Sequence, residues 1–311
     1  MNRHLRRKQL KENKKHSINK DELLKAINLH SEKKFDLAKK IYLDLNKSHP
    51  GNYDVLRHLG ILYQDLGNIE SAYNFYQEAI RINERGFEAL NNLGALHVLN
   101  KNQDLALKCF EKSISINPNY VPTINNLAGL YHRLHNGEKS LLFSKKALAL
   151  QPNNILTMNQ YAKALVLNDK IDEGISIFRK ICNQNPDRFD FKANLATALK
   201  EIGDFKESKE IIDKCFVENF KRLDFFAPYA SDKTNSLEEK HIHFYETQLD
   251  DHSVNKDDKI LISHTFFDYY RNKKNFSKSG DFLKKSNELQ YSLKEFDLQK
   301  EIYLFDKMKT I

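Results

Sequence analysis

The chain has 311 residues, of which 40% are hydrophobic and 30% charged, with six prolines, ten glycines and no tryptophan. This apolar content excludes a wholly disordered chain, and the scarcity of turn residues argues against a β-sandwich, so an all-α fold is expected. The net charge of +8 would suggest a nucleic-acid partner if it were spread along the chain, but six of these charges lie in the first sixteen residues.

Residues 1–16 are predicted to form a basic, disordered arm. They hold seven lysines and arginines against a single acidic residue, Glu12. Such an arm can contact phosphate or an anionic membrane surface, but a solubilising tail is the simpler interpretation. Nucleic-acid binding is therefore not expected. No run of about 18 apolar residues and no signal peptide is present, so we expect a cytoplasmic protein without a membrane span.

Residues 17–222 repeat with a period of 34. The first residues of the six repeats are Asn19, Tyr53, Phe87, Val121, Ile155 and Phe189. Prolines near the end of the repeat keep the same register, at Pro50, Pro118, Pro152 and Pro186. The eighth position is always small: Ala26, Gly60, Gly94, Ala128, Ala162 and Ala196. So is the twentieth: Ala38, Ala72, Ala106, Ser140, Gly174 and Ser208.

Each repeat is predicted to contain two helices. Large residues at positions 4, 7 and 11 form one helical stripe, and those at positions 17, 24 and 28 form a second. Between them lies a turn, such as Leu66-Gly67-Asn68, in which glycine or asparagine is expected to adopt the left-handed conformation. The small residues at positions 8 and 20 indicate where the paired helices cross most closely, and the proline ends the second helix.

This pattern resembles that of the tetratricopeptide repeat (TPR) family. A near-consensus example runs from Leu90-Asn91-Asn92-Leu93-Gly94 through Ala106 and Phe110 to Pro118. The resemblance implies an all-α, right-handed TPR superhelix of antiparallel helix pairs, an α-solenoid. It also implies that the first helix of each repeat lines a concave groove that binds a protein or an extended peptide.

Within that implied groove, the position before the recurring leucine is polar. It is occupied by His58, Asn92, Asn126, Gln160 and Asn194. These groups can hydrogen-bond a peptide backbone whatever its side chains, and similar asparagine ladders occur in the TPR region of O-linked N-acetylglucosamine transferases. The alternative is that these side chains only satisfy the turns of their own repeats.

One TPR subclass binds the terminal carboxylate of chaperone tails through lysines, asparagines and arginine at five groove positions. The matching positions here hold Arg57, Ile61, Asn92, Pro122 and Asn126. They supply one cation where several are needed, so a chaperone tail is not the expected partner.

Residues 223–311 are expected to be a C-terminal helical region outside the register. A degenerate TPR-like pair is predicted near residues 260–293, with Phe267 and Ser279 in its small positions. Residues 275–289 and 301–308 resemble the connector that joins TPR arrays to sulfotransferase domains in bacterial fusion proteins. That resemblance implies, as an alternative function, the recruiting or regulatory part of a sulfotransferase whose catalytic domain is absent from this chain.

No catalytic, cofactor or metal site is expected from the residues. The glycines never form the phosphate-binding turn that a nucleotide enzyme needs. His241 and His243 would point to different sides of a helix, so we interpret them as surface histidines. Cys109, Cys182 and Cys215 are interpreted as reduced, packed thiols. The sequence therefore predicts a non-catalytic TPR scaffold.

Overall fold

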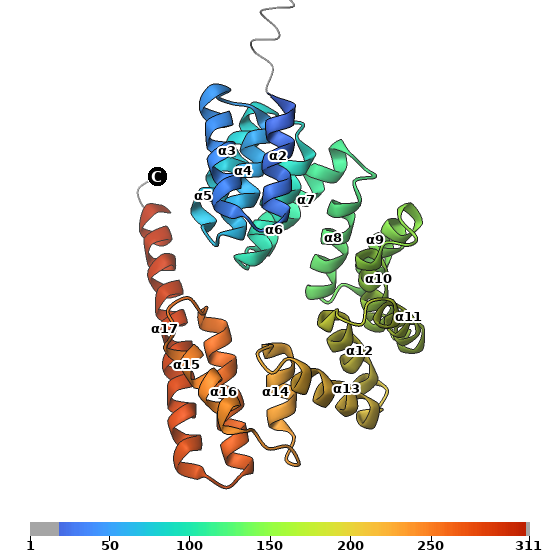
Figure 1. The fold of residues 1–311 in the computed structure, drawn as a ribbon, viewed down its shortest axis with the longest axis vertical. Coiled ribbons are helices and arrows are strands. Elements are labelled where there is room, and N and C mark those ends of the chain that lie inside the picture. Colours follow the sequence, from blue (N-terminus) through green and yellow to red (C-terminus); the bar gives the residue numbers. More distant parts are fainter. Residues whose placement is uncertain (1–18, 309–311) are drawn as a thin grey trace, which may run out of the picture. The chain divides into compact units, whose positions relative to one another are not determined.

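A computed structural model describes residues 19–308, with side chains described through residue 292 (Figure 1). Within that range the chain forms sixteen α-helices and no strand, which confirms the predicted all-α solenoid of helix pairs. The basic arm predicted for residues 1–16 lies outside the described residues. The chain divides into two compact units, with the boundary in the sequence between Asp169 and Lys170, and each unit is described by itself.

Unit 1 alternates between the first helix of each repeat, here called an A helix, and the second, a B helix. Its A helices are α2 (Lys20–Ser31), α4 (Tyr53–Asp65), α6 (Phe87–Leu99), α8 (Val121–Arg133) and α10 (Ile155–Leu167). Its B helices are α3 (Phe35–Ser48), α5 (Ile69–Ile82), α7 (Gln103–Ile116) and α9 (Gly137–Leu150). From α4 onward, successive A helices begin 34 residues apart, as the sequence period predicts.

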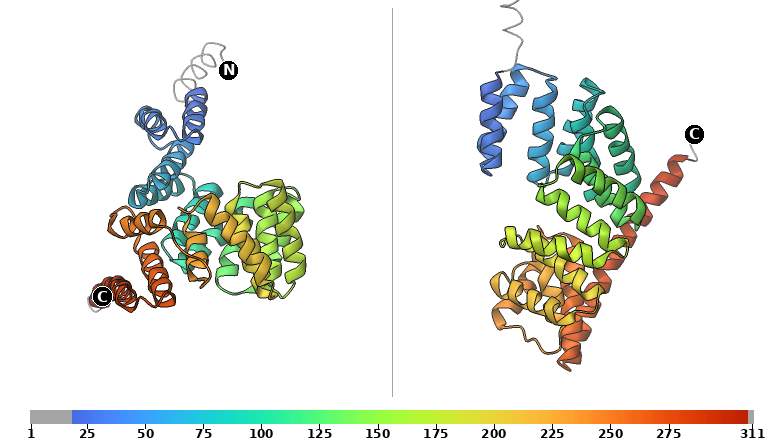
Figure 2. Two further views of the ribbon diagram at one scale, coloured as in Figure 1. Left: turned by 60° about the horizontal axis from the view of Figure 1, so that its bottom comes forward. Right: turned by 90° about the vertical axis from the view of Figure 1, so that its right-hand side faces the viewer.

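The packing of unit 1 defines an inner face. The A helices α4, α6 and α8 each pack against their own B helix, against the preceding B helix and against the next A helix (Figure 2). Among the described residues of this unit, the backbones of successive B helices do not come close to one another. Because the A helices approach each other while the B helices diverge, the stack curves with its A helices on the concave side.

The small residues at positions 8 and 20 lie where the A and B helices cross closely, as expected. A methyl group built on Gly60 would lie 2.4 Å from Tyr76, and one built on Gly94 would lie 2.6 Å from Phe110. Tyr76 and Phe110 occupy position 24 of the same repeats and are buried almost completely. Each glycine therefore leaves room for the aromatic ring that fills the centre of its helix pair.

The turn between A and B helices departs from the sequence prediction. Position 15 is left-handed in every pair, at Lys33, Gly67, Lys101, His135, Asp169, Gly203 and Lys274. Glycine or asparagine was expected, yet only two of these residues are glycine. A non-glycine residue pays about 1–2 kcal/mol in this conformation, but the turn is held by its own hydrogen bonds. For example, the Asn102 N–H donates to the His97 carbonyl at 2.8 Å, as helix-terminating motifs require.

Unit 2 continues the helical order. It contains α11 (Ile171–Gln184), α12 (Phe189–Glu201), α13 (Phe205–Glu218), α14 (Leu223–Ser231), α15 (Glu239–Asp250), α16 (Lys256–Asn272) and α17 (Phe276–Met308). The helix α11 is a B helix, and α12 with α13 forms an A/B pair. The sequence predicts that the 34-residue register ends at Arg222. The structure continues it for one more helix, because α14 begins at Leu223, 34 residues after α12, and Ala230 is buried at its eighth position.

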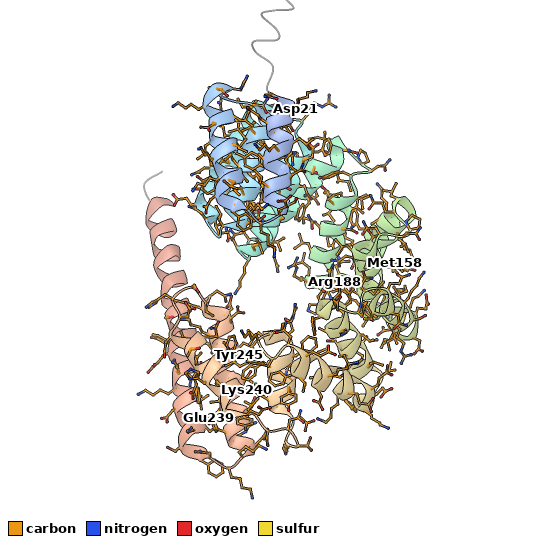
Figure 3. The ribbon with its side chains drawn as sticks, viewed as in Figure 1. Asp21, Met158, Arg188, Glu239, Lys240 and Tyr245 are labelled. Carbon is orange, nitrogen blue, oxygen red and sulfur yellow. The ribbon has the colours of Figure 1, made fainter. Side chains whose placement is uncertain are left out.

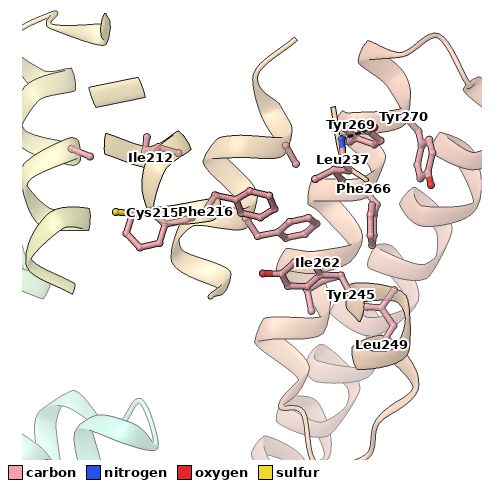
Figure 4. Close-up of a cluster of buried hydrophobic side chains, with 14 residues drawn as sticks. Ile212, Cys215, Phe216, Leu237, Tyr245, Leu249, Ile262, Phe266, Tyr269 and Tyr270 are labelled. Atoms are coloured by element: carbon pink, nitrogen blue, oxygen red, sulfur yellow. Dashed lines mark hydrogen bonds between the residues drawn. The ribbon is translucent and has the colours of Figure 1, made fainter. Parts of the chain in front are cut away.

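One buried cluster runs across residue 222 (Figure 4). It joins Ile212 and Phe216 of α13 to Phe226 of α14 and to Phe266 of α16. Tyr245 of α15, also labelled in Figure 3, stacks on Phe226 with 3.7 Å between ring centroids. The core of unit 2 therefore has no break at residue 222.

The last two helices reproduce the A/B hairpin. Lys274 has the left-handed turn conformation, and Ser279 donates a hydrogen bond to the Phe267 carbonyl at 3.0 Å. The same bond between positions 20 and 8 joins Ser140 to the Ala128 carbonyl at 3.0 Å and Ser208 to the Ala196 carbonyl at 2.7 Å. The pair α16/α17 thus has TPR-type geometry although its eighth position is a phenylalanine.

Candidate peptide-binding face

Four of the five predicted groove residues lie on successive A helices of unit 1. His58, Asn92, Asn126 and Gln160 belong to α4, α6, α8 and α10, and each is partly buried. Since the A helices line the concave side, these side chains follow the inner face of unit 1. Asn194 holds the same position on α12 of unit 2 and is also partly buried.

Asn91, one residue earlier in the repeat, connects two of the predicted residues. Its side chain is only 6% exposed. Its Oδ1 accepts from Asn126 Nδ2 at 2.9 Å and from Thr123 Oγ1 at 3.1 Å, while its Nδ2 donates to Asn92 Oδ1 at 3.3 Å. The sequence prediction missed Asn91, although an asparagine at an otherwise buried helical position was a usable signal.

These bonds orient the amides without exhausting them. Each amide side chain has two N–H donors and an oxygen that can accept twice. Asn126 uses one donor and Asn92 one acceptor position, and neither side chain makes another bond to the described part of the chain. The bonds run to Asn91 rather than to a turn, so the turn-satisfying alternative does not describe Asn92 and Asn126.

The next two A helices repeat the arrangement. Asn125 Nδ2 donates to Thr157 Oγ1 at 3.0 Å, over the same separation of 32 residues as the bond between Asn91 and Thr123. Gln160 lies against Gly129, where a methyl group would sit 3.4 Å from its amide nitrogen. Polar bonds and a glycine therefore set the spacing between α8 and α10.

His58 has a different environment from the amides. Its ring stacks on Tyr42 with a centroid separation of 5.8 Å, and its Nε2 lies 3.0 Å from Arg57 Nη2. Burial, with smaller contributions from the Arg57 and His30 charges, lowers the pKa of His58 to about 3. The imidazole is therefore neutral at pH 7, and because Arg57 can only donate, His58 Nε2 accepts.

His58 also lines a hollow of about 580 Å³ on α2, α3 and α4. Ile27, Phe35 and Ile61 form apolar parts of its wall, so Ile61 belongs to a hydrophobic surface rather than to a carboxylate clamp. The Tyr42 hydroxyl, also in the wall, is buried without a hydrogen-bond partner among the described residues. The first end of the amide row is thus an apolar hollow with a few polar groups.

Cys109 lies partly buried on α7 of unit 1, while the candidate metal residues and the two buried cysteines, Cys182 and Cys215, lie in unit 2. His241, expected at the surface, is 6% exposed, because it packs on Phe216 and Phe220 and its Nδ1 accepts from the Glu238 N–H. His243 is exposed. Among the described residues no three His, Cys, Asp or Glu side chains gather as a metal site. Burial raises the pKa of Cys182 to about 11, so this free thiol is unreactive.

No helix in the described range is both long enough and apolar enough to cross a membrane.

Comparisons with known proteins identify the repeats. Two family models described as tetratricopeptide repeat match residues 54–85 and 87–120. A TPR protein from Parabacteroides merdae aligns at a TM-score of 0.56 and 16% identity, covering 84% of this chain and 98% of that one. A thermophilic TPR protein from Thermus thermophilus aligns at 0.51 and 20%, covering 58% and 98%. PilF of Pseudomonas aeruginosa aligns at 0.56 and 13%, covering 66% and 94%.

At these identities the solved structures establish the fold alone. No curated protein matches the sequence. None of these findings shows the predicted kinship with sulfotransferase fusion proteins, which stays a prediction. The two family models show that residues 54–85 and 87–120 are tetratricopeptide repeats, and the helix pairs of both units show the TPR-type fold.

Proposed function

We propose that the chain is a non-catalytic scaffold that binds an extended segment of another protein along the A-helix face of unit 1. The observation that carries the proposal is the row of partly buried amides on successive A helices, two of which are held by Asn91. An extended peptide presents an N–H and a C=O at every residue, and an amide side chain can pair with both. The row suits recognition of a main chain rather than of one side chain.

Preorganisation strengthens this interpretation. Ordering a free side chain at an interface costs roughly 0.5–1.5 kcal/mol. The bonds of Asn91 already fix the Asn92 and Asn126 amides, and Gln160 lies against Gly129. Much of that cost is therefore met when the repeats fold, before a partner arrives.

A narrower prediction is that the partner is a sulfotransferase domain. It is supported only by the resemblance of residues 275–289 and 301–308 to a known connector, and side chains beyond residue 292 lie outside the described ones. Co-expression with sulfotransferase domains taken from such fusion proteins tests it: a stable complex supports the prediction, and separate elution in gel filtration removes it.

The test of the groove is a selection from a random peptide library on the full chain, followed by fluorescence anisotropy of the selected peptides. The double variant Asn92→Ala/Gln160→Ala removes two amides of the row. With about 1 kcal/mol lost for each hydrogen bond, the Kd should rise about 30-fold. The matched control is Asn74→Ala/Gln77→Ala, which removes one asparagine and one glutamine that are exposed on B helix α5. Equal Kd values for the two double variants would reject the groove.

A further inference from the structure

Beside the amide row lies a cluster of basic side chains. His132, Arg133 and His135 stand at the C-terminal end of α8 and in the following turn, and Lys163 projects from α10. The two A helices pack against each other. Lys163 lies on the same helix as Gln160, one turn further along, so the cluster adjoins the amide row.

The seam between α8 and α10 places Lys163 opposite His132. Two contacts of α8 fix its register, Asn125 with Thr157 and Gly129 with Gln160, and a third comes from the first residue of α9, where the Gly137 carbonyl accepts from Asn168 Nδ2 at 2.9 Å. These partners are separated by 32, 31 and 31 residues. His132 and Lys163 are also 31 residues apart, between the second and third contact.

No acidic side chain of the described residues neutralises this cluster. Lys163, Arg133 and His132 form no ion pair within that range, whereas Arg81 pairs with Glu78 at 2.7 Å elsewhere in unit 1. Burial first, and then the Arg133 charge, lower the pKa of Lys163. Burial, followed by Lys163, His135 and Arg133, lowers the pKa of His132 to about 4. The charges of Lys163 and Arg133 therefore repel each other, and beside them His132 is neutral at pH 7.

One atom of the cluster also lacks a partner in the described part of the chain. His132 Nδ1 is buried and makes no hydrogen bond there. A buried polar atom without a partner is destabilising, which adds to the repulsion between Lys163 and Arg133. Both costs would be relieved by an anion, to which Arg133 can offer two parallel N–H donors and Lys163 three.

We propose that Lys163, Arg133 and His132 form an anion-binding subsite that recognises an acidic group on the peptide bound along the amide row. The inference rests on the proposed function, and it adds the chemistry of the partner: an extended segment with a carboxylate or phosphoryl group next to the residues that the amides hold. None of these three residues is among the five chaperone-clamp positions, so the subsite is a separate feature of this chain.

The first experiment uses the selected peptides and the full chain. Each acidic residue of a peptide is replaced by its amide, and the Kd is measured for wild type and for Lys163→Met/Arg133→Met. At low salt, we expect the replacement to weaken wild-type binding about tenfold and to leave the variant unaffected. The control Lys108→Met/Lys145→Met removes the same charge from exposed B-helix positions and should behave as wild type. Equal sensitivity in all three proteins would overturn the subsite.

This result is distinguishable from failure of the groove. If Asn92→Ala/Gln160→Ala weakens binding while Lys163→Met/Arg133→Met does not, only the subsite is wrong. Peptides that carry phosphoserine or aspartate at the acidic position separate the two sources of the anion. Titration with inorganic phosphate, followed by the ring signals of His132 in NMR, tests the subsite without any peptide. The pKa of His132 should rise in wild type and not in Lys163→Met, and an unchanged value in wild type would contradict the inference.

Discussion

The third repeat and the segment from residue 223 begin in the same way and end differently. Both start on the 34-residue register, with α6 at Phe87 and α14 at Leu223. In the third repeat the A helix runs to Leu99 and pairs with α7, whereas α14 stops at Ser231 and packs against α13 and α16. The next helix, α15, packs on α16 and reaches α14 through side chains, as in the stack of Tyr245 on Phe226, without a close approach of the two backbones.

The difference teaches what an A/B hairpin requires. The third repeat has Ala106 at position 20 and Phe110 at position 24, and the Phe110 ring fits against Gly94. The same positions after residue 223 hold Ile242 and Glu246. A large residue replaces the small one and a charge replaces the aromatic ring, so α15 cannot close on α14. Where a helix starts follows from the local sequence. The pairing of two helices also needs a small residue at position 20 and an aromatic residue at position 24.

The largest expected effect tests the close crossing directly. Gly94→Leu would force a side chain into Phe110, so we expect a loss of about 3 kcal/mol or more in the free energy of unfolding. The control is Gly280→Leu on α17, where nothing lies within 4 Å and helix propensity improves. Urea unfolding followed by circular dichroism measures both. Similar urea midpoints for the two variants would show that the small residue at position 8 does not govern the pairing of the A and B helices.

The second prediction compares two contacts between successive A helices. Asn91→Ala leaves Thr123 and Asn126 without their shared acceptor in a buried position, so we expect a loss of about 2–3 kcal/mol. Asn125→Ala removes a single bond to Thr157 and should cost about 1 kcal/mol. Thermal unfolding of both variants gives the ranking, and the reverse order would contradict the role of Asn91 as the centre of the network.

The third prediction concerns pH. The pKa of His58 is about 3 in the folded chain against an ordinary 6.5, so the unfolded chain takes up this proton first as pH falls. The stability from neutral His58 is full above pH 6.5 and is lost below it. At pH 5 the free energy of unfolding should be lower than at pH 7 by roughly 1–2 kcal/mol, because the partly buried ring resists protonation in the folded chain. Urea midpoints at pH 7 and 5 should differ less in His58→Gln than in wild type. The same change at exposed His243 should have no such effect.

The smallest expected effect concerns the left-handed turn. Lys101→Gly relieves the strain of a non-glycine residue and should stabilise unit 1 by about 0.5–1 kcal/mol, although glycine also gains freedom in the unfolded chain. Gly67→Ala should cost about 1 kcal/mol, and since no atom lies within 4 Å the effect is one of backbone conformation. Differential scanning calorimetry measures both signs. Two shifts in the same direction would contradict this account of the turn.

The sequence predicted those features that depend on spacing within one repeat. The helix starts, the crossings at Gly60 and Gly94 and the ends before the prolines all follow from side-chain size at fixed positions. The left-handed conformation of Lys101 could not be predicted from side-chain size, because the hydrogen bonds of the turn outweigh the residue's own preference for right-handed backbone.

Features that depend on neighbouring repeats were harder to predict. The subsite around Lys163 and His132 requires the register of the seam between α8 and α10, which lies between repeats. The pairing of α14 with α16 was missed for the same reason, since their contact joins segments that share no common repeat.

The central claim is that the inner face of unit 1, formed by its A helices, holds the partner. The most direct test records the side-chain amide signals of the full chain by NMR with and without a selected peptide. The account predicts that the amide signals of Asn92, Asn126 and Gln160 shift together while those of Asn74 and Gln77 on α5 stay in place. Shifts confined to Asn74 and Gln77 would contradict it.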